Sequence, residues 1–113
     1  MNKPQKRCED ICHNLIRSEP GVFKGLNIKR LAKIYCVSCS YLSRTFKNYK
    51  GVNLKEYINR LRLTKSALML MENRHLKVWQ ISDYFGWDCT YSFIKSFRKF
   101  YGVTPGKFRD LVQ

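Results

Sequence analysis

Apolar residues recur at helical spacing along most of the chain, and no segment shows the sustained two-residue alternation of a strand. We therefore predict an all-α fold. Residues 5–18 form a first helix with Ile11 and Leu15 on its apolar side, and a Pro-Gly pair ends it. A second, short helix follows Asn27, whose side chain can cap it.

The segment at residues 40–52 reads SYLSRTFKNYKGV and recurs in outline as SFIKSFRKFYGV after Tyr91. The two copies run in register, so that Arg44 corresponds to Lys95. A short apolar helix and a tight turn precede each copy, and a glycine follows at the position of a left-handed helix cap. This pattern is typical of a helix-turn-helix that occurs twice.

The ends of the remaining helices are also marked. We expect Ser38 to cap the first copy and Asp88 the second. Asn53 starts a long helix between the copies, with Glu56 at the capping-box position. The apolar positions of this long helix are Leu54, Tyr57, Ile58, Leu61, Leu68 and Met71. Thr104, followed by proline, opens a final short helix.

These elements predict two helix-turn-helix subdomains, at 5–52 and 74–113, joined by a linker helix at 53–73. A chain of 113 residues with 44% hydrophobic residues can bury two such small cores. It has no apolar run long enough for a bilayer and no apolar signal-peptide core at its N-terminus. We therefore expect a cytoplasmic protein with no membrane partner.

At about 100° per residue, each repeated helix has an apolar side and a polar side. The apolar sides carry Leu42, Phe46 and Tyr49 in the first copy, and Phe93, Phe97 and Phe100 in the second. The polar sides carry Ser40, Ser43, Arg44 and Lys47 in the first copy, and Tyr91, Ile94, Lys95 and Arg98 in the second. We predict that the apolar sides pack into the core, which leaves the polar sides available for binding.

The charge of the chain indicates what these polar sides bind. The sequence has 22 lysines and arginines against 8 acidic residues, a net charge of +14. No acidic residue occurs between Glu19 and Glu56, or between Asp88 and Asp110, and these two windows hold the repeated helices. So much positive charge favours a polyanionic partner, with nucleic acid first and an anionic membrane surface as the lesser alternative.

Double-stranded DNA fits the residue types on the polar sides. Arg44 can donate two hydrogen bonds to a guanine edge, and Ile94 can contact a thymine methyl group. Hydroxyl groups that can reach bases or phosphates belong to Ser40, Ser43, Thr90 and Tyr91. Lys47, Arg98 and Lys99 are placed to contact phosphates. The long helix would measure ~30 Å against the ~34 Å turn of B-DNA, so a monomer could reach two successive major-groove segments.

Other readings remain open at this point. Cys36 and Cys39 form a C-x-x-C pair at the turn before the first repeated helix, which allows a redox- or metal-responsive DNA-binding sensor. The competing interpretation is that the cysteines are small structural residues, and their odd number speaks against a disulfide framework.

Two further classes compete with duplex binding. An RNA or single-strand binding module would use Tyr41 and Tyr91 to stack on bases. A protein-interaction adaptor would bind RNA polymerase through the basic surface. The sequence shows no nucleophile–base pair, no glycine-rich phosphate loop and no carboxylate pair, so we predict no enzyme, no cofactor and no metal site.

The residues also resemble a known family. The stretch LAKIYCVSCSYLSRTFKNYKGV and the later VWQISDYFGWDCTYSFIKSFRKFYGVTPGKFR are similar to the DNA-binding domain of AraC/XylS-type bacterial transcription regulators. The similarity runs from about Cys8 to Asp110, and GVTPGKFR is its most specific part. The resemblance implies seven helices, two recognition helices in adjacent major-groove segments of an asymmetric site, and activation through RNA polymerase. It also implies either the stand-alone subgroup similar to MarA and SoxS, or an excised domain.

The resemblance further implies which residues contact bases. They are Ser40, Ser43 and Arg44 in the first recognition helix, and Thr90, Tyr91, Ser92, Ile94 and Lys95 in the second. The chain departs from the family pattern with Cys36 in place of the usual glycine and Ser82 in place of the usual alanine. Lys95 stands where arginine is frequent, and lysine lacks the planar two-point contact of arginine. We therefore expect the second helix to contribute less base specificity.

Overall fold

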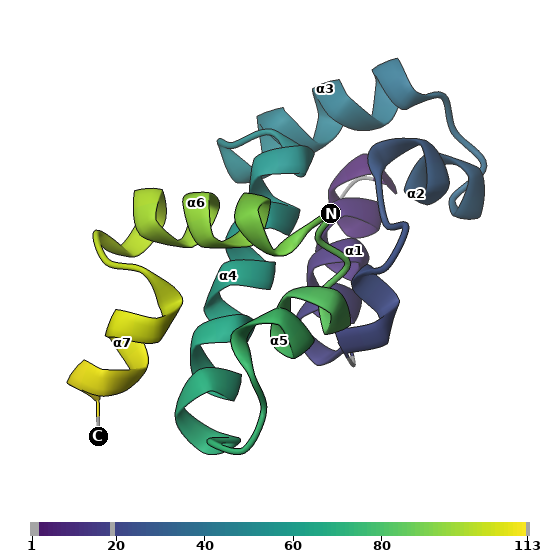
Figure 1. Cartoon of the computed structure of the whole chain (residues 1–113). Helices are drawn as coiled ribbons and strands as arrows, with labels where there is room; N and C mark the ends of the chain where they lie inside the picture. The colour runs from purple at the N-terminus through teal and green to yellow at the C-terminus, as the bar shows by residue number, and fades with distance from the viewer. Residues whose placement is uncertain (1–2, 19, 113) are drawn as a thin grey trace. The chain divides into compact units, whose positions relative to one another are not determined.

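The computed structural model describes residues 3–18 and 20–112, and within them the chain is entirely helical, as predicted (Figure 1). The elements in order are α1 (Lys3–Arg17), a 3-10 helix η1 (Pro20–Phe23), α2 (Ile28–Ile34), α3 (Cys39–Lys50), α4 (Leu54–Glu72), α5 (Val78–Tyr84), α6 (Thr90–Tyr101) and α7 (Pro105–Leu111). The α2–α3 and α5–α6 pairs are the two predicted helix-turn-helix motifs. None of the helices described is both long and apolar enough to cross a bilayer.

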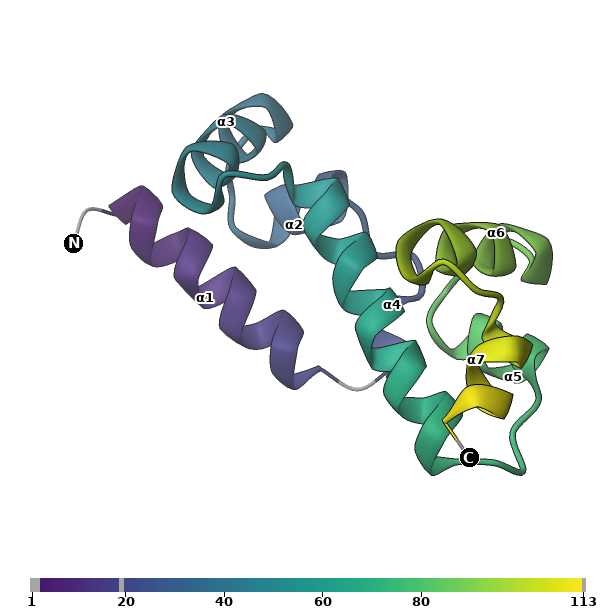
Figure 2. The same cartoon turned by 90° about the vertical axis from the view of Figure 1, so that its left-hand side faces the viewer.

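The described residues form two compact units. Unit 1 contains residues 3–18 and 26–61, and unit 2 contains residues 20–25 and 62–112. The chain therefore enters unit 2 briefly, through η1, before it returns to unit 1 with α2. Helix α4 is continuous and supplies its first part to unit 1 and its second part, from Arg62 onward, to unit 2 (Figure 2).

Unit 1 is built around the apolar side of α3. Leu42 and Phe46 are fully buried, and α3 packs on both α1 and α2. Ile11 and Leu15 of α1 are buried as their helical spacing predicts. The ring of Phe46 lies 5.3 Å, centre to centre, from that of Tyr57 on α4, an edge-tilted arrangement that aromatic pairs favour.

Unit 2 has a core that is mainly aromatic. Phe93 and Phe97 of α6 are fully buried, and the Phe97 ring lies 5.4 Å from that of Phe108 on α7. Phe23 of η1 is also buried, with its ring 5.9 Å from that of Phe85. η1 thus contributes an aromatic side chain to this core, which explains why residues 20–25 belong to unit 2.

The predicted apolar stripe of α4 is wrong in its second half. Leu68 and Met71 are 50% and 45% exposed, whereas Leu63, Ala67 and Leu70 are buried. The physical reason is that α4 serves two cores. At about 100° per residue, Leu63, Ala67 and Leu70 fall on a different side of the helix from Leu54 and Ile58, which are buried in unit 1.

The apolar faces of the repeated helices are shorter than predicted. Tyr49 and Phe100 were expected to be buried with the other aromatic residues, but they are 37% and 46% exposed. Both lie in the last turn of their helices, whereas the buried residues lie in the earlier turns. The buried side therefore consists of Leu42 and Phe46 in α3.

Most of the predicted helix caps are confirmed, one is wrong, and α1 runs from Lys3 to Arg17 rather than over 5–18. Asn27, Ser38 and Thr104 cap their helices through side-chain hydrogen bonds, as predicted. Asp88 is not the cap of α6, because the capping residue is Cys89. The second copy carries one extra residue just before its helix. The cap therefore corresponds to Ser38 in the register of the helices, which gives Cys89, and not in the register of the turns, which gives Asp88.

Candidate nucleic-acid interface

In unit 1 the tight turn between α2 and α3 is held by backbone hydrogen bonds. The Val37 N–H donates to the Ala32 carbonyl at 3.0 Å, and the Cys36 N–H donates to the Lys33 carbonyl at 3.2 Å. Cys36 has φ 56°, the left-handed region, where a side chain is strained and the family usually has glycine. The departure noted in the sequence therefore falls on a position where the backbone itself favours glycine.

The turn of unit 2 repeats this pattern. The Trp87 N–H donates to the Ser82 carbonyl at 3.2 Å, and the Gly86 N–H donates to the Asp83 carbonyl at 3.1 Å. Gly86 has φ 78°, and a Cβ there would lie 2.6 Å from the Phe23 carbonyl oxygen. Glycine is thus required at this turn both by the backbone angle and by the close approach of η1.

The outward side of α3 carries the predicted contact residues of unit 1. Ser40, Arg44 and Lys47 are exposed, and Ser43 is partly buried. The helix begins with the Ser38 hydroxyl accepting a hydrogen bond from the Tyr41 N–H at 3.1 Å. α3 contains no acidic residue, so its outward side presents only neutral and positive groups.

The outward side of α6 carries the corresponding residues of unit 2. Tyr91 is 72% exposed, and Lys95, Arg98 and Lys99 are also exposed. Thr90, Ser92 and Ile94 are partly buried. α6 likewise contains no acidic residue. The structure thus brings all the predicted residues of this copy onto one helix, with the three cations fully accessible.

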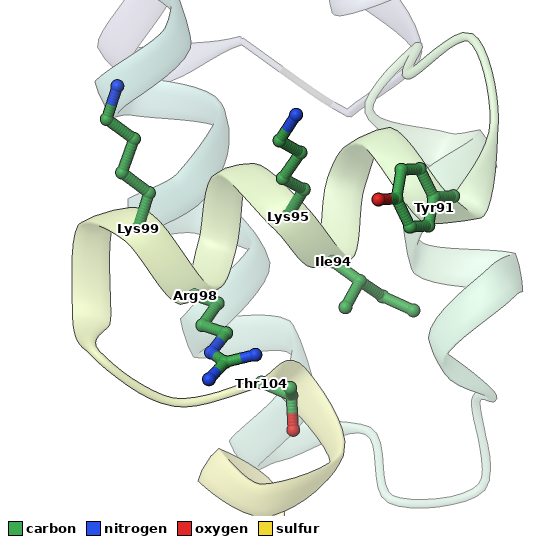
Figure 3. Close-up of a pocket in the computed structure, with 6 residues that line it drawn as sticks. All are labelled: Tyr91, Ile94, Lys95, Arg98, Lys99 and Thr104. Atoms are coloured by element: carbon green, nitrogen blue, oxygen red, sulfur yellow. The ribbon is translucent and has the colours of Figure 1, made fainter.

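A shallow open pocket of about 390 Å³ runs beside α6. Its lining residues are Tyr91, Ile94, Lys95, Arg98, Lys99 and Thr104. Figure 3 shows Arg98 extending from α6 toward Thr104 at the start of α7, while Lys95 and Lys99 project away from it. The pocket lining thus combines three cations with the side chains of Tyr91, Ile94 and Thr104.

Sequence reasoning missed Arg62, a half-buried arginine on α4. Its Nη1 donates to the carbonyl oxygens of Phe85 at 3.2 Å and Gly86 at 3.3 Å. Its guanidinium carbon lies 4.1 Å from the centre of the Trp87 ring. Burial lowers the pKa of Arg62, and the charge of Asp88 opposes this shift. A charged residue on a helix normally indicates a solvated face, so nothing in the sequence pattern indicates this role.

Sequence reasoning also missed Arg109 on α7. This partly buried guanidinium donates three hydrogen bonds to backbone carbonyls: Nε to Leu70 at 3.1 Å, Nη1 to Leu76 at 2.7 Å and Nη2 to Asn73 at 3.2 Å. It therefore satisfies carbonyls at and after the C-terminal end of α4, which an isolated helix would leave without partners. Its role is to hold α7 against α4.

The five cysteines fall into two groups. Cys8 and Cys12 of α1 are buried, and burial raises the pKa of the Cys8 thiol. Cys36, Cys39 and Cys89 are exposed, so the interpretation as buried structural residues holds only for the first pair. The Cys89 Sγ lies 3.3 Å from the Ser92 Oγ, and this contact lowers the pKa of Cys89. Over the part of the chain that the structure describes, no three His, Cys, Asp or Glu side chains gather as metal ligands.

Comparisons with known proteins agree with this architecture. A family described as "Helix-turn-helix domain" matches residues 31–110. The Msm operon regulatory protein of Streptococcus mutans is 33% identical over 99 residues, which make up 88% of this chain and 34% of that protein. The probable transcription factor PqrA of Proteus vulgaris is 32% identical over 87 residues, 77% of this chain and 70% of that protein. The chain thus spans about a third of the first relative and most of the second.

A solved structure supports the same assignment. The crystal structure of a Chromobacterium violaceum transcriptional regulator, described as an AraC-type DNA-binding domain-containing protein, has 27% sequence identity to this chain. It superposes with a TM-score of 0.68 over 75% of both chains. With the family match over residues 31–110 and the repeated helix-turn-helix in both units, this chain belongs to the AraC-type helix-turn-helix family.

Proposed function

We propose that the protein is a transcription regulator that binds double-stranded DNA sequence-specifically through the outward sides of α3 and α6. The observation that carries this proposal is the division of each helix. In α3 the side with Phe46 is buried, whereas the side with Arg44 and Lys47 is exposed and free of acidic residues. α6 shows the same division, with Phe97 buried and Lys95 exposed.

The residue types assign different tasks to these side chains. Arg44 reads a guanine edge, and Ile94 contacts a thymine methyl group. Ser40, Ser43, Thr90, Tyr91, Ser92 and Lys95 complete the set of base contacts. Lys47, Arg98 and Lys99 neutralise phosphates and fix the register of the protein on the duplex. In this proposal α3 and α6 enter two adjacent major-groove segments, and a monomer occupies the site.

We further infer that the two halves of the DNA site differ in sequence. Arg44 on α3 corresponds to Lys95 on α6, and Ser40 corresponds to Tyr91. Because unlike side chains read unlike bases, the site is not a palindrome. The protein then acts as an activator that contacts RNA polymerase when bound beside a promoter. Transcription in vitro with purified RNA polymerase tests that step. Transcript levels that stay unchanged although the protein occupies its site beside the promoter would contradict it.

Two matched variants test DNA reading directly. Arg44→Ala should cost ~1–3 kcal/mol of binding free energy and relax the preference at one base position, because a bidentate contact is lost. Lys47→Ala should weaken binding to all duplexes alike and reduce the slope of log K against log salt concentration by about 1. Titration by fluorescence anisotropy at several salt concentrations measures both effects.

Competition defines the class of nucleic acid. Duplex DNA should displace a labelled duplex at lower concentration than single-stranded DNA or RNA of the same sequence. If single strands compete equally well, Tyr41 and Tyr91 act as stacking platforms and the duplex proposal is wrong. If both alanine variants bind a selected duplex as the unaltered protein does, the outward sides of α3 and α6 are not the reading surface.

A further inference from the structure

We propose that Arg62 is a positioning residue for DNA reading by α6. In this role Arg62 fixes the turn between α5 and α6, so that α6 presents its outward side to the DNA in one defined orientation. This inference rests on the proposed DNA-binding function and adds a residue that lies outside the reading surface. Arg62 is on α4, whereas the side chains proposed to reach the bases are on α6.

A continuous series of contacts within unit 2 connects Arg62 to α6. The guanidinium carbon stands 4.1 Å from the centre of the Trp87 ring, and the Trp87 ring centre is 5.6 Å from that of Phe93. Phe93 is fully buried on α6 and directly precedes Ile94 and Lys95. In this proposal the Trp87 ring, held by Arg62, supports Phe93 and thereby sets the orientation of α6 and of its outward side.

The same arginine holds the backbone of the turn. Its Nη1 donates hydrogen bonds to the carbonyl oxygens of Phe85 and Gly86, at the C-terminal end of α5. These carbonyls follow the last turn of α5, where a helix leaves acceptors without intrahelical partners. Gly86 also has the left-handed φ of 78° that reverses the chain toward α6. Arg62 thus contacts the turn both at its backbone and at the side chain of Trp87.

Only arginine can make both kinds of contact at once. Its planar guanidinium stacks on an aromatic ring with one face and donates hydrogen bonds from its edge. Lysine keeps the positive charge but provides neither a flat surface nor a fixed pair of donors. Burying a charged group costs free energy, and the bonds from Nη1 to the two turn carbonyls offset part of that cost at Arg62.

The proposal predicts a local defect in reading. Loss of the stack on Trp87 should blur discrimination in the half of the DNA site that α6 reads. The half that α3 reads should be unaffected, because α3 belongs to unit 1. A residue that supports folding alone would instead lower the amount of active protein and weaken binding to every sequence in proportion.

The experiment compares Arg62→Lys with the matched control Arg60→Lys. Arg60 lies two residues earlier on α4, is exposed, and forms an ion pair with Glu56 at 3.0 Å. A duplex site is first selected with the unaltered protein. For each variant, the ratio of its affinity for this site to its affinity for single-base variants of the site is then measured at every position of both halves. Thermal unfolding and the salt dependence of binding are recorded in parallel.

We expect Arg62→Lys to reduce discrimination in the α6 half by about tenfold, the size of one lost directional base contact, with the α3 half unchanged. The salt slope should stay the same, because no phosphate contact is removed. Trp87→Leu should reproduce this defect, which keeps the test valid if Arg62→Lys folds poorly. The double variant should be no worse than either single one, since both remove the same interaction. Arg60→Lys should match the unaltered protein.

Three results would overturn the proposal. A uniform loss across both halves that follows the fraction of unfolded protein would make Arg62 a purely structural residue. A salt slope reduced by about 1 in Arg62→Gln but not in Arg62→Lys would make it a direct phosphate contact. Unchanged discrimination in both Arg62→Lys and Trp87→Leu would remove the role altogether. If the unaltered chain selects no sequence, the proposed DNA-binding function fails first, and the two failures are thereby distinguished.

Discussion

At the scale of single residues, the two turns show how one position can tolerate a side chain while its counterpart cannot. Cys36 and Gly86 both have left-handed backbone angles, with φ of 56° and 78°. At Gly86 an added Cβ would meet the Phe23 carbonyl oxygen at 2.6 Å. Cys36 is exposed, so its side chain is accommodated and only the left-handed backbone angle is unfavourable there.

We therefore expect Cys36→Gly to stabilise the protein. The left-handed angle costs an L-residue roughly 1–2 kcal/mol, and the extra unfolded-state freedom of glycine offsets roughly 0.5–1 kcal/mol of the relief, so the net gain should lie between about 0 and 1.5 kcal/mol. Urea unfolding measures it. Gly86→Ala is the contrasting variant and should be destabilising by more than the backbone cost alone. If Cys36→Gly unfolds at a lower urea concentration than the unaltered protein, the angle at Cys36 is not strained in solution.

A second residue-scale prediction concerns the thiol of Cys89. Its pKa is lowered because the Ser92 hydroxyl and nearby backbone N–H groups stabilise the thiolate. A depressed folded-state pKa means that this stabilisation is complete above the ordinary thiol pKa and is lost as pH falls through the lowered value. Ser92→Ala should therefore slow alkylation of Cys89 at neutral pH and shift its pH profile upward. Cys36 and Cys39 in the same sample serve as controls, and a change in their rates would point to general unfolding.

At the scale of elements, α4 shows where sequence patterns stop being sufficient. The existence of this helix and its start after Asn53 follow from capping and periodicity, and the Glu56 N–H donates to the Asn53 Oδ1 at 2.8 Å. The side of α4 that is buried in unit 2 does not follow from a single apolar periodicity, because two cores bury two different sides of the same helix. The role of η1 was missed for a related reason: the contact between Phe23 and Phe85 joins residues that are distant in sequence.

The change of side in α4 gives a matched pair of variants. Leu63 is buried in unit 2, whereas Leu68 on the same helix is 50% exposed. Leu63→Ala should cost about 2–5 kcal/mol of unfolding free energy, because it leaves a cavity. Leu68→Ala should change stability by no more than about 0.5 kcal/mol. Similar losses from both variants, measured by urea unfolding, would contradict the assignment of the buried side.

The proposed DNA-reading surface, the outward sides of α3 and α6, is the part of the candidate site that the sequence pattern predicts most directly. The repeat, the acid-free windows and the 3.6-residue period together separated Arg44 from Phe46 without any structure, since adjacent helical faces differ by simple arithmetic. Arg62 and Arg109 lay beyond that arithmetic. Their partners are backbone carbonyls 23 to 39 positions away, and such contacts exist only after the chain has folded.

At the scale of the whole molecule, charge and duplication act together. A net charge of +14 gives affinity for any polyanion, and that affinity declines as salt rises. In the proposed function, sequence preference comes from the unequal outward sides of α3 and α6, one in each unit. Binding in this proposal therefore has two parts: a salt-dependent attraction to the phosphates of any DNA, and sequence-specific base contacts made by two non-identical helices.

Selection of bound sequences from random duplex DNA, followed by titration of the selected site, tests this central claim most directly. We expect one enriched, non-palindromic site with two unlike halves about one helical turn apart, the spacing at which adjacent major-groove segments face one protein. Arg44→Ala should relax only the half read by α3. Recovery of no preferred sequence, or of a palindrome that both halves share, would contradict it.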